Sequence, residues 1–168
     1  MASCGYLHSL FIDVDSSVWS CGYNGMGELG LGDQFLRNIP EKIKTLPPIV
    51  AISAGNHHSL FLDNQACVWG CGNNGDGQIG SGRTECSLKP EKIQGIPEIK
   101  SIQSLGDSSF LIDNEGSVWA CGYNEFAQLG FGDCLPRLKF DKLEGLSNIV
   151  SVSGGIHSLF LDCDWETS

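Results

Sequence analysis

The sequence has no long apolar run and few charged residues. No stretch approaches the roughly 18 apolar residues that a membrane-spanning helix needs, so we expect nothing that crosses a bilayer. The start, Met1-Ala2-Ser3-Cys4-Gly5, lacks the basic segment followed by an apolar segment that marks a secretory signal. Charged residues are only 18% and hydrophobic residues 41% of the 168, which excludes a disordered, highly charged chain.

Basic residues are also scarce. Ten Lys and Arg stand against 20 Asp and Glu, for a formal net charge of −10. Affinity for nucleic acids comes mainly from Lys and Arg that neutralise phosphates, so a nucleic-acid partner is not expected. An anionic membrane surface is disfavoured for the same reason. The eight Cys are too few for a disulfide scaffold and, with no export signal, predict a chain in the reducing cytoplasm or nucleus.

Glycine is abundant, and the sequence repeats itself every 50 residues. The 22 Gly favour short strands joined by tight turns. The most regular repeat positions are Trp19, Trp69 and Trp119; Cys21, Cys71 and Cys121; Asp13, Asp63 and Asp113; and Lys42, Lys92 and Lys142. At this period the chain holds about 3.4 units. We bound them at residues 5–54, 55–104 and 105–153, with a partial unit at 154–168.

Each unit predicts four short β-strands. At the boundary between the first two units, a β-branched run at 49–53 leads into an apolar run at 59–62. The turn residues Asp63 and Asn64 bond their own backbone readily, as a hairpin needs, and a third strand follows at 67–71. A fourth strand is expected at 90–93, with Pro at its start as an edge strand allows. No segment has a helical period, so the fold class is all-β.

The repeated motifs resemble a known family. Gly-x-x-His-Ser, then an apolar strand, a turn and Val-Trp-x-Cys-Gly-x-Asn-x-x-Gly-[Gln/Glu]-[Leu/Ile]-Gly-x-Gly are similar to the RCC1 (regulator of chromosome condensation) repeat over nearly the whole chain. The resemblance implies a β-propeller of seven four-stranded antiparallel blades, of which this chain supplies about three, as a half-propeller or a fragment of the ring. Two departures stand out. Cys occupies a position where the family usually has Trp, and Glu125-Phe126-Ala127 replaces a Gly-x-Gly turn.

Two glycine motifs resemble a cofactor cradle but predict a turn. Residues 25–30 and 75–80 both match Gly-x-Gly-x-x-Gly. A dinucleotide site needs that motif to open a helix, and no helical pattern follows either copy. The third repeat loses the motif altogether. We therefore predict structural turns and no cofactor.

The repeated His-Ser pairs predict packing rather than catalysis. His8, His58 and His157 are each followed by Ser, whereas a catalytic centre needs its groups to converge once. We interpret each His as a hydrogen-bonding partner of a neighbouring blade's backbone. His57 alone lies off this register, and one ligand makes no metal site. The chain is therefore predicted to be no enzyme and to hold no metal.

The cysteines leave one question open. Cys67 and Cys71 are four residues apart, but no second pair follows, so we expect buried strand cysteines and not a zinc site. Cys86, Cys134 and Cys163 fall in loops or the tail, and the sequence does not decide whether they are reactive.

Nine of the ten basic residues fall between each glycine-rich block and the following edge strand. They form a peripheral band that we interpret as protection against edge-to-edge strand pairing. They are Arg37, Lys42, Lys44, Arg83, Lys89, Lys92, Arg137, Lys139 and Lys142.

The function that these observations favour is a non-catalytic protein–protein interaction scaffold. Rigid blades would present variable loops as a docking face. The candidate partner-binding residues are the unmatched ones in equivalent loops: Tyr23, Met26, Asn73, Asp76, Tyr123, Glu125 and Phe126. Phe126 would either anchor an interface or pack on the adjacent blade.

The resemblance implies an alternative, guanine-nucleotide exchange on a Ran-type small GTPase, which the family's founding member carries out. That activity uses a protruding β-wedge, and the nearly uniform spacing of this chain leaves no insertion for one.

Self-association is a further expectation. An open arc of blades leaves edge strands exposed, and exposed edges template pairing, so we expect dimers or larger assemblies. Two copies supply about 6.7 repeats, close to one ring.

Overall fold

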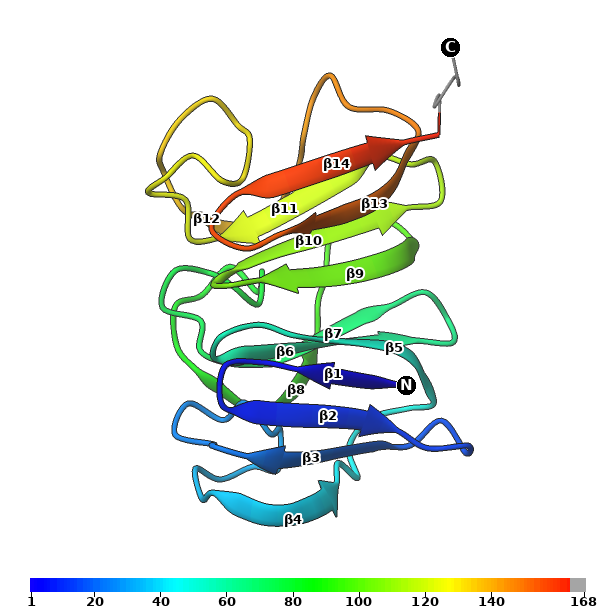
Figure 1. Cartoon of the computed structure of the whole chain (residues 1–168), viewed down its shortest axis with the longest axis vertical. Coiled ribbons are helices and arrows are strands. Elements are labelled where there is room, and N and C mark those ends of the chain that lie inside the picture. Colours follow the sequence, from blue (N-terminus) through cyan, green and yellow to red (C-terminus); the bar gives the residue numbers. More distant parts are fainter. Residues whose placement is uncertain (164–168) are drawn as a thin grey trace.

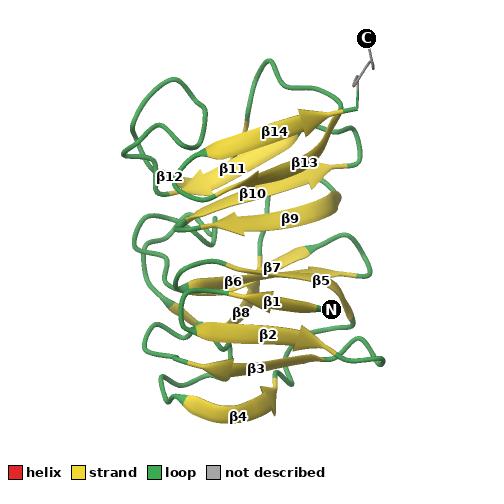
Figure 2. Ribbon diagram, viewed as in Figure 1, coloured by secondary structure: helices red, strands yellow, loops and turns green. Residues whose placement is uncertain are grey.

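The computed structural model describes residues 1–163, which form strands joined by loops (Figures 1 and 2). The strands pair antiparallel into three four-stranded sheets and one two-stranded sheet, each in chain order. None of the described residues forms a helix that could cross a membrane. The strands are β1 (Ala2–Cys4), β2 (His8–Ile12), β3 (Val18–Gly22), β4 (Arg37–Lys42), β5 (Ile49–Ala54), β6 (His58–Asp63), β7 (Val68–Gly72), β8 (Ser87–Lys92), β9 (Ile99–Leu105), β10 (Ser108–Asp113), β11 (Val118–Gly122), β12 (Arg137–Lys142), β13 (Ile149–Gly154) and β14 (Ser158–Asp162).

The sheets are arranged as successive blades. We call β1–β4 blade 1, β5–β8 blade 2 and β9–β12 blade 3; β13 and β14 begin a fourth. The first strands meet, because β5 contacts both β1 and β9, and β9 contacts β13. Figure 1 shows the blades following one another along the long axis of the molecule, from blue to red. The all-β prediction of about three propeller blades is therefore confirmed.

The core lies between the blades rather than inside one sheet. Phe61 and Leu111 occupy equivalent positions in β6 and β10, and both are buried against the preceding blade. Phe11, at the same position in blade 1, is 36% exposed, since the described residues hold no blade before it. At the other end Leu159 is 61% exposed, whereas its equivalent Phe110 is buried. Burying one such side chain is worth about 2 kcal/mol, so stability depends on neighbouring blades.

In each of the three blades, an Asp side chain hydrogen-bonds the turn and a Trp side chain of the hairpin between the second and third strands. We call this arrangement the Asp-Trp clasp. Asp63 Oδ1 accepts hydrogen bonds from the backbone N–H of Gln65 (2.8 Å) and Cys67 (2.9 Å), and Oδ2 accepts one from Trp69 Nε1 (2.9 Å). Burial opposes ionisation of Asp63, but these bonds outweigh it and hold its pKa below the usual value. The sequence predicted the backbone bonds and missed the indole. The same clasp forms at Asp13 with Trp19 and at Asp113 with Trp119.

The fourth strand of each blade lies at the edge of its sheet, as expected, but it begins earlier. Strand β8 spans Ser87–Lys92, so the expectation of a strand that starts at Pro90 was wrong. The register shifts between the pairs Gly70–Glu91 and Gly72–Ser87. Pro90 falls in this irregular stretch, where its missing N–H costs the ladder no bond.

The sheets keep the period of the sequence units but begin at another point in it. The first strand of each sheet, such as β5, stands at the end of the unit bounded at 5–54. A period fixes the spacing of equivalent residues and leaves the starting point free.

Candidate partner-binding surface

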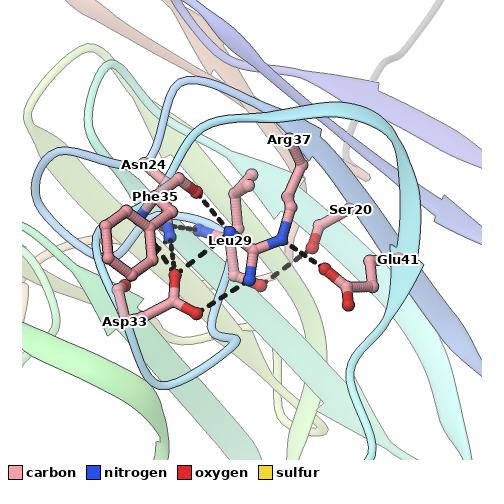
Figure 3. Close-up of polar contacts among 7 residues, drawn as sticks. All are labelled: Ser20, Asn24, Leu29, Asp33, Phe35, Arg37 and Glu41. Atoms are coloured by element: carbon pink, nitrogen blue, oxygen red, sulfur yellow. Dashed lines mark hydrogen bonds and ion pairs between the residues drawn. The ribbon is translucent and has the colours of Figure 1, made fainter.

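The three glycine-rich loops, residues 23–36, 73–86 and 123–136, extend from the same side of the blades, on the left in Figure 1. A buried Asn holds each loop in shape. In blade 1, Asn24 Oδ1 accepts a hydrogen bond from Leu29 N (2.9 Å) and Nδ2 donates one to Asp33 O (2.9 Å), as Figure 3 shows. The equivalent residues Asn74 and Asn124 make the same pair of bonds.

An Arg-Asp ion pair completes this loop in blades 1 and 3. Arg37 Nη2 lies 2.7 Å from Asp33 Oδ2, and its Nε donates to Glu41 (Figure 3). The guanidinium lowers the pKa of Asp33. Arg137 and Asp133 repeat the pair. In blade 2 the Asp position is Arg83, which pairs with Glu91 instead.

The loops of blades 1 and 2 are covered by the fourth strand of the following blade. Gly32 N donates to Leu88 O and Gly82 N donates to Leu138 O, both at 2.8 Å. A Cβ on Gly27 would lie 2.8 Å from Leu88 Cα. The backbone of the next blade therefore fills the space beside these glycines. This leaves no room for a cofactor cradle at either copy.

Buried His-Ser pairs join the blades on the same side. His8 Nε2 lies 3.0 Å from Ser59 Oγ, and Ser59 donates its own proton to Glu28 O (2.7 Å), so His8 is the donor. His58 and Ser109 repeat the arrangement at 2.8 Å between blades 2 and 3. His8 and His58 thus bond a neighbouring side-chain hydroxyl, so the prediction of a backbone acceptor was wrong for these two; His157, the third member of the predicted set, is exposed.

Burial keeps these histidines neutral. It lowers the pKa of His8 to about 4, although the charge of Glu28 acts in the opposite direction, and lowers the pKa of His58 to about 3. Both side chains are enclosed between blades, so their role is structural. Within residues 1–163, no three His, Cys, Asp or Glu side chains gather in a way that could hold a metal ion.

Of the predicted surface residues, Tyr23 joins a cluster that the sequence did not reveal. Its ring lies 6.2 Å from that of His57, edge to face, and Tyr6 lies 5.9 Å from the same ring. His57 Nδ1 is 3.1 Å from the buried carboxylate of Glu28. The available signal was that Glu28 stands where the other repeats have Gln78 and Gln128.

Met26 and Asn73 come from different blades and meet at Cys86. The Sγ of Cys86 lies 3.9 Å from Met26 Sδ and 3.8 Å from Asn73 Oδ1. Cys71 is buried in its strand, as predicted, and burial raises its pKa. Cys67 is only half-buried and lies in the turn before β7, so the expectation of a buried strand cysteine was wrong there.

The remaining four predicted residues lie close together around the loop of blade 3. Tyr123 donates its hydroxyl proton to Glu125 Oε2 (2.7 Å), and its ring lies 6.0 Å from that of Phe126. Phe126 is 68% exposed. Burial, Asp107 and Glu125 raise the pKa of Asp76, so these carboxylates share one negative region. We call Asp76, Asp107, Tyr123, Glu125, Phe126 and Ala127 the Phe126 surface.

Solved structures share this fold over part of their length. Prp20p from Saccharomyces cerevisiae, a protein with binding properties to Gsp1p and histones, superposes with a TM-score of 0.86 at 21% identity, over 94% of this chain and 42% of Prp20p. Human WBSCR16 gives a TM-score of 0.85 at 22% identity, over 96% of this chain and 44% of its own. The chain therefore spans less than half of either structure.

Sequence comparison points the same way. The probable E3 ubiquitin-protein ligase HERC6 of Homo sapiens is 41% identical over 56 residues, which are 32% of this chain and 6% of that protein. The regulator of chromosome condensation (RCC1) repeat matches residues 15–62, 65–112 and 115–161. Together the three matches cover most of the sequence, so the chain belongs to the RCC1 repeat family.

Proposed function

We propose that the chain is a non-catalytic scaffold that binds protein partners through its glycine-rich loops. The observation that carries the proposal is that the repeated polar side chains hold the blades together, whereas unmatched side chains in the loops are exposed. The repeated Asp, Asn and His residues are engaged in clasps and blade-to-blade bonds. The unmatched residues Tyr23, Met26 and Phe126 project exposed surface from the same loops. The exposed positions of these loops can vary in this way because the packing between blades does not depend on them.

Affinity capture with loop variants tests this function. We expect the wild-type chain to retain specific proteins, and at least one of the paired variants Tyr23→Ala/Met26→Ala, Asn73→Ala/Asp76→Ala or Tyr123→Ala/Phe126→Ala to lose them. Val14→Ala, a fully exposed change in a hairpin turn away from the loops, is the control. Equal retention by every variant would contradict the proposal. We place the scaffold in the cytoplasm or nucleus, where fluorescence microscopy of the tagged chain would locate it.

Nucleotide exchange on a Ran-type GTPase is the alternative. The likeness to Prp20p supports a shared fold, and the chain covers 42% of that structure. We expect no faster release of labelled GDP when the chain is mixed with GDP-loaded Ran-type GTPase. Acceleration would replace the scaffold proposal with exchange, because the propeller would then prefer the nucleotide-free GTPase.

Self-association through exposed apolar surface is a further part of the proposal. Phe11 at one end and Leu159 at the other expose apolar surface whose equivalents are buried between blades. We expect the mass measured by light scattering to exceed that of the 18.1 kDa monomer as concentration rises. A constant monomer mass at high concentration would contradict this part.

A further inference from the structure

A cavity opens where the chain passes from blade 2 into blade 3, on the side opposite the glycine-rich loops. The hairpin turn between β10 and β11 lies on this side, on the right in Figure 1. The cavity has a volume of about 310 Å³, which is within the usual range of ligand sites. We call it the Trp119 pocket; its lining residues are Pro97, Glu98, Asp113, Asn114, Glu115, Trp119 and Lys142.

The indole of Trp119 is a fixed wall of this pocket. Its Nε1 donates a hydrogen bond to Asp113 Oδ2 (3.0 Å). Asp113 Oδ1 in turn accepts bonds from the backbone N–H groups of Glu115 (3.0 Å) and Ser117 (2.8 Å). The Asp-Trp clasp therefore holds the half-buried ring and the hairpin turn in one arrangement before a ligand binds, so little free energy is lost in ordering them.

Two further carboxylates make the pocket negative. Glu98 and Glu115 are both exposed, and within residues 1–163 neither forms an ion pair with a Lys, Arg or His. Glu98 Oε2 accepts a long hydrogen bond from Asn114 Nδ2 (3.4 Å). With Asp113, three carboxylates face the single ammonium of Lys142, which leaves a net charge of −2 around the cavity.

The equivalent positions of blade 2 lack both glutamates. Pro48 stands in the place of Glu98, and Gln65 stands in the place of Glu115. The ring is nevertheless repeated as Trp69, with the same hydrogen bond to its clasp. The aromatic wall thus belongs to the repeat, whereas the pair of glutamates distinguishes blade 3 from blade 2. Positions that vary on a constant framework are the ones that can select a ligand.

We propose that the Trp119 pocket binds an Arg side chain of a partner protein. A guanidinium is planar, so it can stack on an aromatic ring while its N–H groups donate to carboxylates. In the pocket it stacks on Trp119 and donates to Glu98 and Glu115. A Lys ammonium is compact and more strongly hydrated, which makes it the poorer ligand here. The negative charge of the pocket disfavours acidic side chains.

This site goes beyond the proposed function. It lies on the hairpin side of the blades, whereas the loops assigned to the scaffold lie on the other side (Figure 1). Both of its walls come from the connection of blade 2 to blade 3 and from blade 3 itself, all of which the structure describes. Its test is therefore separate from the capture experiment, whose variants all lie in the glycine-rich loops.

Titration of the whole chain with the blocked peptide acetyl-Gly-Arg-Gly-amide, followed by NMR of the indole N–H groups, tests the inference. The Trp119 signal should shift, while Trp19 and Trp69 in the same sample should shift much less. We expect millimolar affinity, because one cation–π contact and two exposed ion pairs contribute only a few kcal/mol. The peptide with citrulline, a neutral analogue of Arg, should bind at least about fivefold more weakly, and the peptide with Lys should bind more weakly than that with Arg.

Charge-removing variants test the two glutamates. Glu98→Gln and Glu115→Gln should each weaken binding of the Arg peptide by about two- to fivefold, and the double variant by about tenfold. Both side chains are exposed, so these variants should fold as the wild type does. Glu85→Gln removes the same charge from an exposed position of the blade 2 loop and should change the affinity by less than about 1.5-fold.

Several results would overturn the inference. These are no shift of Trp119, an equal shift of Trp69, equal binding of the Arg and citrulline peptides, or an unchanged affinity in the double variant. Tighter binding of the Lys peptide would overturn the choice of Arg. Free arginine that binds at least tenfold more tightly than the blocked peptide would indicate a small-molecule site, and would overturn the assignment to a partner protein.

Discussion

The glycine-rich loops of the first two blades and of the third blade differ in what packs against them. In blades 1 and 2 the next blade packs against the loop at its buried glycines. A His-Ser hydrogen bond joins the two blades beside it. In blade 3 the equivalent positions are Ala127 and Ser108, and the loop is exposed. The hydrogen bonds between Asn124 and the loop backbone nevertheless match those of Asn24 and Asn74.

This contrast shows which residues shape a loop and which ones join blades. These hydrogen bonds of the buried Asn are present in all three repeats, so they shape the loop whatever packs against it. The Gly and His positions change together in the third repeat, so they belong to the junction.

The largest expected effect comes from exchanging the Gly and Ala of the two kinds of loop. Gly77→Ala places a Cβ against the backbone of Leu138 at a φ of 83°, and should lower the free energy of unfolding by about 3 kcal/mol or more. Ala127→Gly, at a φ of 57° on an exposed loop, should change it by less than about 1 kcal/mol. Urea denaturation measures both. Similar losses in the two variants would show that the two loops are packed alike.

The next effect concerns the His-Ser bond. His58→Ser copies the third repeat into the second, and should cost about 2–3 kcal/mol because it opens a cavity and removes a buried bond. Ser108→Ala removes only the local bond to Tyr123 O and should cost about 1 kcal/mol. Thermal unfolding of the two variants gives the order. A larger loss in Ser108→Ala would mean that the junction does not depend on the histidine.

Acid should first weaken the blade junctions that a buried His-Ser hydrogen bond joins. The unfolded chain binds protons at His near pH 6.5, whereas folded His58 and His8 have pKa values of about 3 and about 4. Stability is therefore full above about pH 6.5 and falls as the pH is lowered toward the folded pKa values, by an amount on the order of 2 kcal/mol for each histidine at pH 5. Urea midpoints at several pH values measure this, and His58→Ser should show a shallower decline. A flat profile between pH 7 and 5 would contradict the burial of both rings.

The smallest effect compares hairpin clasps at the end and the middle of the array. Asp63 is buried, whereas Asp13 is half-buried. Asp63→Asn should lower the free energy of unfolding by about 1–2 kcal/mol through weaker bonds from Trp69 and the turn. Asp13→Asn should lower it by less. Equal losses would show that burial of the carboxylate adds nothing to the clasp.

Periodicity made the blades predictable, because residues that recur at one spacing must have recurring surroundings. The hairpin turn at Asp63 and the edge position of β8 follow from local chemistry that sequence carries directly. Contacts between blades do not follow in the same way. The bond from His58 to Ser109 joins residues 51 apart in sequence, and only the packing of two sheets brings them together.

The candidate surface was predictable in its location and not in its composition. Unmatched residues in equivalent loops marked Tyr123, Glu125 and Phe126. The pairing of His57 with Glu28 depends on two loops from different blades, so neither residue stood out as a partner of the other. Sequence alone did not show that Ala127 carries a Cβ at the position where Gly77 contacts the backbone of the next blade.

Amide hydrogen exchange of three equivalent glycines tests the central contrast most directly. Gly32 and Gly82 donate their N–H groups to the next blade, whereas no described strand covers Gly132, which is exposed. We predict that the Gly32 and Gly82 amides exchange about 100-fold or more slowly than the Gly132 amide, because their exchange requires a blade junction to open. Equal protection at all three would show that the loop of blade 3 is covered like the others, and would contradict the contrast between it and the loops of blades 1 and 2.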